Sequence, residues 1–186
     1  MSARIDLLRH GETERGGGFR GSLDDALTAP GWQQMRKAVE GAGPWDVLVS
    51  SPLQRCAAFA EELAARRGVP LHREADLREL HFGDWEGRSA AELMHTDAKA
   101  LGLFWADPYG YTPPGGEPLV QFESRVLAAI ARLRQRFAQQ RLLVISHAGV
   151  MRLLLAQAQG LPRQRLLEVV VAHGQLLSLD DAGNAP

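Results

Sequence analysis

A histidine between an arginine and a glycine follows the first apolar run of the chain. Residues 5–8 predict a buried strand, and Arg9, His10 and Gly11 come directly after it. An imidazole nitrogen can act as a nucleophile and form a covalent intermediate, and glycine lets the backbone turn sharply because it has no side chain to clash. An exposed basic patch at a strand end explains the same residues, so the motif alone leaves both interpretations open.

Two further apolar runs lead to polar residues that could meet the first group. Residues 47–49 precede Ser51 and Arg55, and residues 142–145 precede His147. Neighbouring strands of a parallel sheet bring their carboxyl ends to one edge, where ligands bind. Two arginines and two histidines would then converge beside helix N-termini, which offer free N–H groups. A phosphate dianion fits this site because its oxygens suit guanidinium forks.

These residue types predict phosphoryl transfer rather than binding alone. His10 would attack phosphorus, while His147 and the arginines would stabilise charge on the equatorial oxygens. Nearby arginines favour the neutral imidazole that a nucleophile needs, because like charges disfavour its protonated form.

The leaving alcohol needs a proton, and Glu79 is the candidate acid. It lies among Leu77, Leu80 and Phe82 in the sequence, and apolar neighbours favour the neutral form of a carboxyl group. A helix-capping or salt-bridged glutamate explains the same residue more simply. Four other acidic residues compete for the role: Glu12, Asp84, Glu86 and Glu117.

Charge and composition argue against other classes of protein. The 186 residues carry a formal net charge of −1, so no basic field favours nucleic acid or a membrane as partner. The single cysteine, Cys56, allows no internal disulfide, and its helical pattern favours a buried, inert thiol. We see no signal peptide or membrane span and expect a cytoplasmic location.

The six histidines show no tight ligand spacing, and no cysteine cluster accompanies them. We therefore expect no metal and no other cofactor. His72, His95 and His173 are expected at surface or structural positions, and His81 is undecided. A small-molecule phosphate ester is the expected partner, and a homodimer is an open alternative to a monomer.

Alternating strand and helix patterns must position these residues. Thr28 caps a predicted helix over residues 30–41, and Ser51 predicts the capping-box start of a helix that Gly68 ends. The other predicted helices cover 89–101, 118–139 and 150–158. The other predicted strands cover 71–73, 169–171 and 176–179, and a frayed tail is expected from Asp180.

The alternation predicts an α/β fold, a three-layer sandwich in which helices cover both faces of a mostly parallel sheet. The length fits one domain over residues 1–186. A cap or lid is expected at about residues 84–117, which end in a segment rich in tryptophan, tyrosine, proline and glycine.

Two segments could shape the ligand. The loop over residues 14–28 contains four glycines and is either a flexible connector or a mobile loop that brings Arg20 over the ligand. No Gly-Lys-Ser/Thr follows it, so it is not a Walker-type loop. Arg15 and Arg20 could grip a flat base together with Trp105, Tyr109 and Tyr111, although simple packing is the commoner role of loop aromatics.

Five motifs spread in order over residues 5–150 resemble the histidine phosphatase superfamily, which includes the cofactor-dependent phosphoglycerate mutases. They are Arg9-His10-Gly11-Glu12-Thr13, Ser50-Ser51-Pro52-Leu53-Gln54-Arg55, the stretch from Glu79 to Gly87, Pro114-Gly115-Gly116-Glu117 and Ser146-His147-Ala148-Gly149. The resemblance implies a phosphoglycerate mutase-like fold with a small cap insertion. It implies His10 as the phosphorylated nucleophile and Glu79 as proton donor and acceptor.

The same resemblance implies Arg9, Arg55 and His147 as the phosphate-binding set. We add Thr13, Gly16, Arg20 and Ala148 as further residues that bind phosphate or substrate. Two positions depart from the pattern of the superfamily. Gly16 stands where many relatives have a pocket asparagine, and Pro118 stands where many have serine. Proline suits the first position of a helix, so we expect little consequence at Pro118.

The short chain looks similar to the phosphatases of the superfamily rather than to its mutases. Its glycine-rich loop is most similar to that of the alpha-ribazole phosphatases of cobalamin synthesis. The expected activity is hydrolysis of a phosphate monoester through a phosphohistidine, with alpha-ribazole 5′-phosphate as the substrate. A cofactor-dependent phosphoglycerate mutase, a broad-specificity phosphatase and an inactive module that binds a phosphorylated ligand are the alternatives.

Overall fold

A five-stranded sheet in the order β3-β2-β4-β1-β5 forms the centre of the molecule. The computed structural model describes residues 3–180. Four strands run parallel and β5 (Leu176–Ser178) pairs antiparallel with β1 at one edge. The parallel strands are β1 (Arg4–Arg9), β2 (Val47–Ser50), β3 (Leu71–Arg73) and β4 (Arg141–Ser146). The mostly parallel sheet predicted from the sequence is confirmed.

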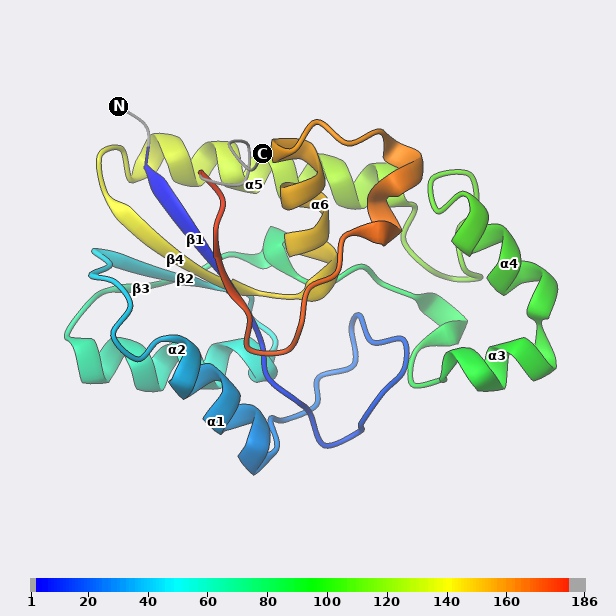
Figure 1. Cartoon of the computed structure of the whole chain (residues 1–186), viewed down its shortest axis with the longest axis horizontal. Helices are drawn as coiled ribbons and strands as arrows, with labels where there is room; N and C mark the ends of the chain where they lie inside the picture. The colour runs from blue at the N-terminus through cyan, green and yellow to red at the C-terminus, as the bar shows by residue number, and fades with distance from the viewer. Residues whose placement is uncertain (1–2, 181–186) are drawn as a thin grey trace.

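Helices cover both faces of this sheet, as predicted (Figure 1). One face packs against α1 (Ala29–Ala38) and α2 (Gln54–Arg67), and the other against α5 (Leu119–Arg136) and α6 (Ala148–Ala158). Successive strand residues point to opposite faces, so Leu7 joins the α5–α6 core while Leu8 joins the α1–α2 core. The inner strands β1, β2 and β4 therefore bury apolar residues on both sides, which explains the unbroken apolar runs.

The register brings three strand ends together. Arg9 lies opposite Ser146, and Ser50 lies opposite Ile145. Because β4 lies between β1 and β2, the residues that follow these three strands meet at one edge.

The starts of the first two helices differ in their capping. Thr28 caps α1 as predicted, and its hydroxyl accepts a hydrogen bond of 3.0 Å from the Gly31 amide. The predicted capping box at Ser51 is wrong. Helix α2 begins at Gln54 after Leu53 and has no side-chain cap. The Gln54 amide donates to the Asp24 carboxylate at 2.6 Å instead of to Ser51, and the Ser51 hydroxyl accepts from the His147 ring at 2.7 Å.

Two short helices replace the single helix predicted over residues 89–101. They are α3 (Ala90–Thr96) and α4 (Ala98–Ala106). Ser89 and Glu92 form a capping box at the start of α3, and Asp97 ends α3 while its carboxylate caps α4. Both helices lie to one side of the sheet, past the strand ends (Figure 1). Two 3-10 turns, η1 (Ala75–Leu77) and η2 (Gly83–Trp85), lead to them.

The C-terminal part departs most from the predictions. After η3 (Arg163–Glu168), the predicted strand over residues 169–171 is wrong, since this segment is irregular. Its carbonyls accept from arginines instead: Val169 from Arg152 at 2.7 Å and Val171 from Arg9 at 2.6 Å. The frayed tail predicted from Asp180 is wrong at its first residue, because the Asp180 carboxylate accepts a hydrogen bond of 2.9 Å from the Ile5 amide. The rest of the predicted tail lies outside the described residues.

Three smaller predictions can also be compared with the structure. Pro118 precedes the first residue of α5 rather than occupying it. Cys56 is fully buried, as predicted, and burial raises the pKa of its thiol. None of the described helices has the length and apolarity needed to cross a membrane.

Candidate active site

His10 follows β1 and has one ring nitrogen available. Its Nδ1 lies 2.8 Å from the carbonyl oxygen of Gly11, so Nδ1–H donates and the lone pair is on Nε2. Burial, reinforced by the charge of Arg55, lowers the pKa of His10 to about 3. The imidazole is therefore neutral at pH 7, which is the state that a nucleophile requires.

Gly11 is required by a close approach between two segments. A Cβ atom at this position would overlap the backbone of Gly31, near the start of α1. Its φ is not among the positive values, so the sharp turn expected here is not the reason for the glycine.

Arg9 holds one buried donor that has no partner among the described residues. Its Nη1 donates to the Val171 carbonyl at 2.6 Å, and its Nη2 donates to Nε2 of His173 at 3.0 Å. The Nε of Arg9 is buried and has no hydrogen-bond partner within residues 3–180. A buried donor of this kind is rare in proteins and can donate to an anion that enters the site.

His147 and Arg55 lie directly behind His10. The rings of His10 and His147 have centroids 5.3 Å apart. Arg55 Nε donates to Nδ1 of His147 at 3.3 Å, and Nε2–H of His147 donates to the Ser51 hydroxyl. Burial, with the charge of Arg55, lowers the pKa of His147 well below its usual value.

The terminal nitrogens of Arg55 are occupied by the glycine-rich loop. They donate to the carbonyl oxygens of Leu23 and of Gly21, the latter at 2.9 Å. Neither Arg55 nor His147 is among the described residues that line the cavity in front of His10. The structure thus brings both beside His10 as buried support, in which Arg55 carries the charge.

The side-chain carboxylate of Glu79 lies next to the N-terminus of α6. Its Oε2 accepts from the Gly149 amide at 2.9 Å, and its Oε1 accepts from its neighbour Leu80 at 3.0 Å. A side chain on Gly149 would overlap the Glu79 carboxylate, so glycine is required there. Helix N-termini favour negative groups, which explains why this carboxylate is held at the cavity wall.

The competing acidic residues have other partners. Glu117 forms an ion pair with Arg125 at 2.7 Å, and Glu86 accepts from the amides of Ser22 and Leu23. Glu12 accepts from the Thr28 hydroxyl. Neither these three nor Asp84 are among the described residues that line the cavity, whereas Glu79 is.

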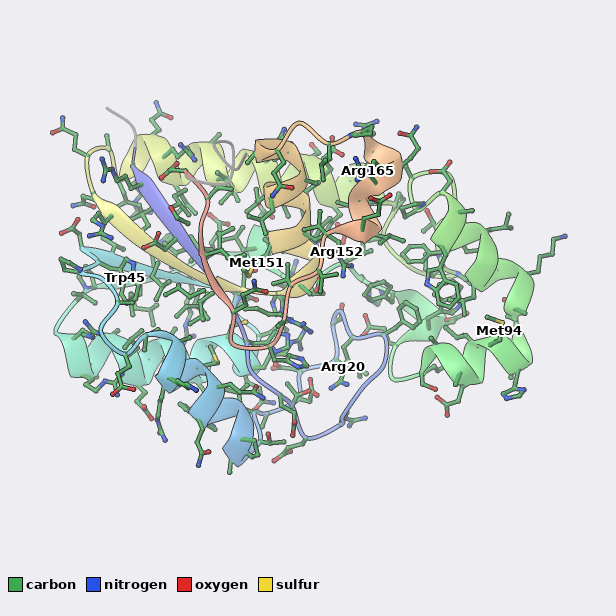
Figure 2. All side chains as sticks on the ribbon, viewed as in Figure 1. Arg20, Trp45, Met94, Met151, Arg152 and Arg165 are labelled. Atoms are coloured by element: carbon green, nitrogen blue, oxygen red, sulfur yellow. The ribbon has the colours of Figure 1, made fainter. Side chains whose placement is uncertain are left out.

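A cavity of about 550 Å³ lies in front of His10. Its charged and polar wall comprises Arg9, His10, Thr13, Arg20, Glu79, Arg152 and His173, and its aromatic wall comprises Phe19, Phe82, Phe104, Trp105 and Phe122. The predicted residues Gly16 and Ala148 also line it. Figure 2 shows Arg152 on α6 and Arg20 on the glycine-rich loop, both between the sheet and helices α3 and α4.

Comparison with known proteins agrees with this geometry. The sequence profile of the histidine phosphatase superfamily (branch 1) matches residues 5–185. The chain belongs to this superfamily. The family resemblance and the α/β fold expected from the five motifs are confirmed.

Individual relatives cover nearly the whole chain. It is 34% identical over 181 residues to adenosylcobalamin/alpha-ribazole phosphatase of Salmonella typhimurium (strain LT2), which covers 95% of this chain and 90% of that protein. It is 34% identical to glucosyl-3-phosphoglycerate phosphatase of Mycolicibacterium vanbaalenii over 86% of this chain and 75% of that protein. The crystal structure of the alpha-ribazole phosphatase from Shigella flexneri has a TM-score of 0.81 at 33% identity, covering 93% of this chain and 88% of that one.

One acidic residue of this histidine phosphatase escaped the sequence analysis. The Asp25 side chain is 2% exposed and forms ion pairs with Arg20 at 2.7 Å and with Arg55 at 3.5 Å. Burial raises its pKa, but hydrogen bonds from Thr13 and Arg20 outweigh burial and the net shift is downward. Asp25 therefore stays ionised and holds two arginines of the histidine phosphatase together. No sequence motif indicated this role of Asp25, because only the folded glycine-rich loop brings Asp25 next to Arg55.

Two cavity residues of the histidine phosphatase were also missed. His173 was expected at a surface or structural position, yet its ring lies 5.7 Å from that of His10. Arg152 had no predicted role. A signal for Arg152 existed, because it follows Ala148 and Gly149 by one helical turn and so shares their face of α6.

The departure at Gly16 leaves space in the cavity. Gly16 has a φ of 68°, and a Cβ atom there would meet nothing within 4 Å. Arg20 lines the cavity beside it and donates to the Thr13 hydroxyl. Of the three predicted stacking aromatics, only Trp105 lines the cavity among the described residues. Tyr109 bonds Glu123, and Tyr111 stacks on Trp85.

Proposed function

We propose that this chain is a phosphomonoesterase that hydrolyses a small-molecule phosphate ester through a phosphohistidine at His10. The observation that carries the proposal is the free Nε2 of a neutral His10 in a cavity that also holds the unpaired Arg9 Nε and the Glu79 carboxyl group. A nucleophile, an anion-binding donor and a proton donor are the groups that this reaction needs.

The first step transfers the phosphoryl group to His10. Nε2 attacks phosphorus, the ester P–O bond breaks, and the leaving oxygen takes a proton from Glu79. Arg9 donates to an equatorial oxygen, and Arg55 and His147 stabilise the developing charge from behind His10.

The second step restores the enzyme. Glu79, now a carboxylate, accepts a proton from water, and the oxygen of that water attacks the phosphorus. The N–P bond breaks, inorganic phosphate leaves, and the neutral imidazole is recovered with its proton still on Nδ1. Thr13, Gly16, Arg20 and Ala148 complete the proposed wall around phosphate and substrate.

Alpha-ribazole 5′-phosphate of cobalamin synthesis is the proposed substrate. Relatives named for this activity support it, and so does the aromatic wall, since Trp105 is 47% exposed and can stack on a flat base. A second candidate is a broad-specificity phosphatase, favoured by relatives named for a different phosphate ester. We place the enzyme in the cytoplasm, as one domain whose residues 84–117 act as a lid.

The decisive experiment is a kinetic panel with phosphate release as the readout. It compares alpha-ribazole 5′-phosphate, 3-phosphoglycerate, fructose bisphosphate and a phosphohistidine peptide. A kcat/KM for the ribazole ester at least about tenfold above the others supports that substrate, and similar values support broad specificity. Isomerised product without phosphate release would identify a mutase, and binding without turnover would identify an inactive module.

A further inference from the structure

A cluster of three polar side chains lies behind the alcohol side of the cavity, the side on which the aromatic wall and Arg152 lie. We call Tyr109, Glu123 and Arg163 the wall cluster. Oε2 of Glu123 accepts from the Tyr109 hydroxyl, and its Oε1 accepts from Nη2 of Arg163 at 2.8 Å. The guanidinium carbon of Arg163 lies 4.6 Å from the centroid of the Tyr109 ring, as in a cation–π contact. Each side chain of the cluster therefore contacts the other two.

The wall cluster joins three segments that line the cavity (Figure 1). Its residues come from the segment after α4, from α5 and from η3, in that order along the chain. The cavity residues next to them in the chain are Pro108, Phe122 and, one 3-10 turn away, Leu166. A loss of contacts within the cluster would therefore let these walls of the cavity shift relative to one another.

Packing alone does not hold this wall, because a second cavity of about 180 Å³ lies behind it. Leu166 lines both cavities. The three residues of the wall cluster line the second cavity and are not among the described residues that line the first. Empty space behind a side chain removes the contact atoms that would otherwise resist its displacement. The polar contacts of the cluster replace that packing as the connection between the segment after α4, α5 and η3.

The contact between Tyr109 and Glu123 is the stronger part of the cluster. Burial, with the hydrogen bond to Glu123, raises the pKa of Tyr109, so the hydroxyl stays protonated and can donate. A hydrogen bond to a charged acceptor is stronger than one between neutral groups. The contact of Arg163 with Glu123 is weaker, since the Arg163 side chain is 59% exposed and exposed ion pairs contribute little.

We propose that Tyr109 is a positioning residue that holds the aromatic wall at the spacing needed to bind the alcohol part of the substrate. The proposal deepens the phosphomonoesterase function given above and rests on it. A wall that is already in place binds a ligand without the entropic cost of being ordered. Tyr109 contacts neither the phosphoryl group nor the alcohol, so its effect is confined to alcohols large enough to reach the wall.

Two esters with the same reacting group test this role. Ethyl phosphate and naphthylethyl phosphate are both esters of primary alcohols, but only the second is large enough to reach the aromatic wall. Tyr109→Phe should raise KM for naphthylethyl phosphate about 3- to 10-fold, the value of one hydrogen bond. It should leave kcat for both esters, and KM for ethyl phosphate, unchanged. Because KM does not depend on the concentration of folded enzyme, partial unfolding of the variant does not produce this pattern.

Variants of the partner residues should give graded effects. Glu123→Ala should match or exceed Tyr109→Phe, and Glu123→Gln should be intermediate because it still offers an oxygen to the hydroxyl. Arg163→Met should have a smaller effect. Tyr109→Phe should add little in the Glu123→Ala background, and additive increases in KM would contradict a shared role. Tyr111→Phe is the matched control: it removes a hydroxyl from the same segment, but Tyr111 stacks on Trp85, and both KM values should stay unchanged.

Three results would overturn the proposal. They are a wild-type KM that is equal for the two esters, a KM for naphthylethyl phosphate that Tyr109→Phe leaves unchanged, and an equal rise in KM for both esters. Hydrolysis of the esters by wild-type enzyme would still support the proposed function in each case. If wild-type enzyme hydrolyses neither ester, the proposed function fails. Calorimetric Kd values of both esters for wild type and Tyr109→Phe then decide the positioning role, because binding at the wall needs no turnover.

Discussion

The two sides of the His10 cavity are built differently. On the phosphate side, Arg55, His147, Ser51 and Asp25 are buried and bonded to one another and to the loop. On the alcohol side, Trp105 is half exposed and Arg152 keeps two free terminal nitrogens within the described residues. The phosphate side is fixed in advance, as stabilisation of a transition state requires. The side chains on the alcohol side remain available to contact a ligand, so this side can discriminate between substrates.

The largest effect is expected at the nucleophile. His10→Ala should lower kcat by at least about 10⁴-fold for every phosphate ester, because no other group can accept the phosphoryl group. Acid-quenched wild-type enzyme should carry an acid-labile phosphate on His10. Phosphate found on serine or cysteine, or activity that survives the substitution, would refute the mechanism.

Glu79→Gln separates proton transfer from the rest of the phosphate side. An ester of an aliphatic alcohol should lose about 10²- to 10⁴-fold in kcat, since the leaving alkoxide then lacks its proton. Para-nitrophenyl phosphate should lose much less in its first step, because nitrophenolate leaves without a proton. The burst of nitrophenol on mixing measures that step, and an equal loss for both esters would remove Glu79 from the role of acid.

Asp25→Asn tests whether the phosphate side depends on the buried ion pairs that Asp25 forms with Arg20 and Arg55. Breaking a buried ion pair costs about 3–5 kcal/mol of the free energy of unfolding, and the repulsion between Arg20 and Arg55 adds to it. We expect a lower midpoint in urea and a weaker affinity for inorganic phosphate. A double-mutant cycle with Arg20→Met isolates the pair. If phosphate binds more tightly to Asp25→Asn, Asp25 only reduces the positive potential and does not position the arginines.

Acid should destabilise the phosphate side through its histidines. The pKa of His10 is about 3 in the folded protein against about 6.5 in the unfolded chain. Between these values the unfolded state binds more protons, so the free energy of unfolding falls as pH decreases from about 6.5 toward 3. The slope approaches about 1.4 kcal/mol per pH unit for His10, and His147 adds in the same direction.

Urea unfolding at a series of pH values from 7 to 4 measures this slope. His147→Asn should flatten it relative to wild type. His95→Asn, at an exposed position on α3, is the matched control and should leave it unchanged. An identical pH dependence in His147→Asn and wild type would contradict the expectation.

The smallest effect is expected at the aromatic wall. Trp105→Ala should raise KM for alpha-ribazole 5′-phosphate by about 3- to 10-fold, the value of one aromatic stack. The KM for a small alkyl phosphate should stay unchanged. Leu103→Ala lies on the same helix, is 48% exposed and is not among the described cavity residues, so it serves as the control. Equal changes for both esters would place the aromatic base elsewhere.

Much of the fold and the candidate site could be predicted because the signals for them lie in short contiguous segments of the sequence. The apolar runs before His10, Arg55 and His147 predicted three strands, and parallel sheets gather strand ends at one edge. The capping box at Ser51 failed because the amide and the side chain of Gln54 donate to Asp24, which is 30 residues away in the chain. The strand over residues 169–171 failed for the same reason, since Arg9 and Arg152 take its carbonyls.

The sequence by itself thus determined the sheet and the family, and it predicted the nucleophile. Tertiary structure alone decided which hydrogen-bonding groups are already occupied and which stay free. Asp25 binds Arg20 and Arg55 only because the glycine-rich loop folds across the strand ends. Within residues 3–180, Arg9 Nε and the two terminal nitrogens of Arg152 have no hydrogen-bond partner, because the segments around them bond the other nitrogens of these arginines. Hydrogen bonds are short-ranged and depend on direction, so pairing between distant segments is fixed only once the chain has folded.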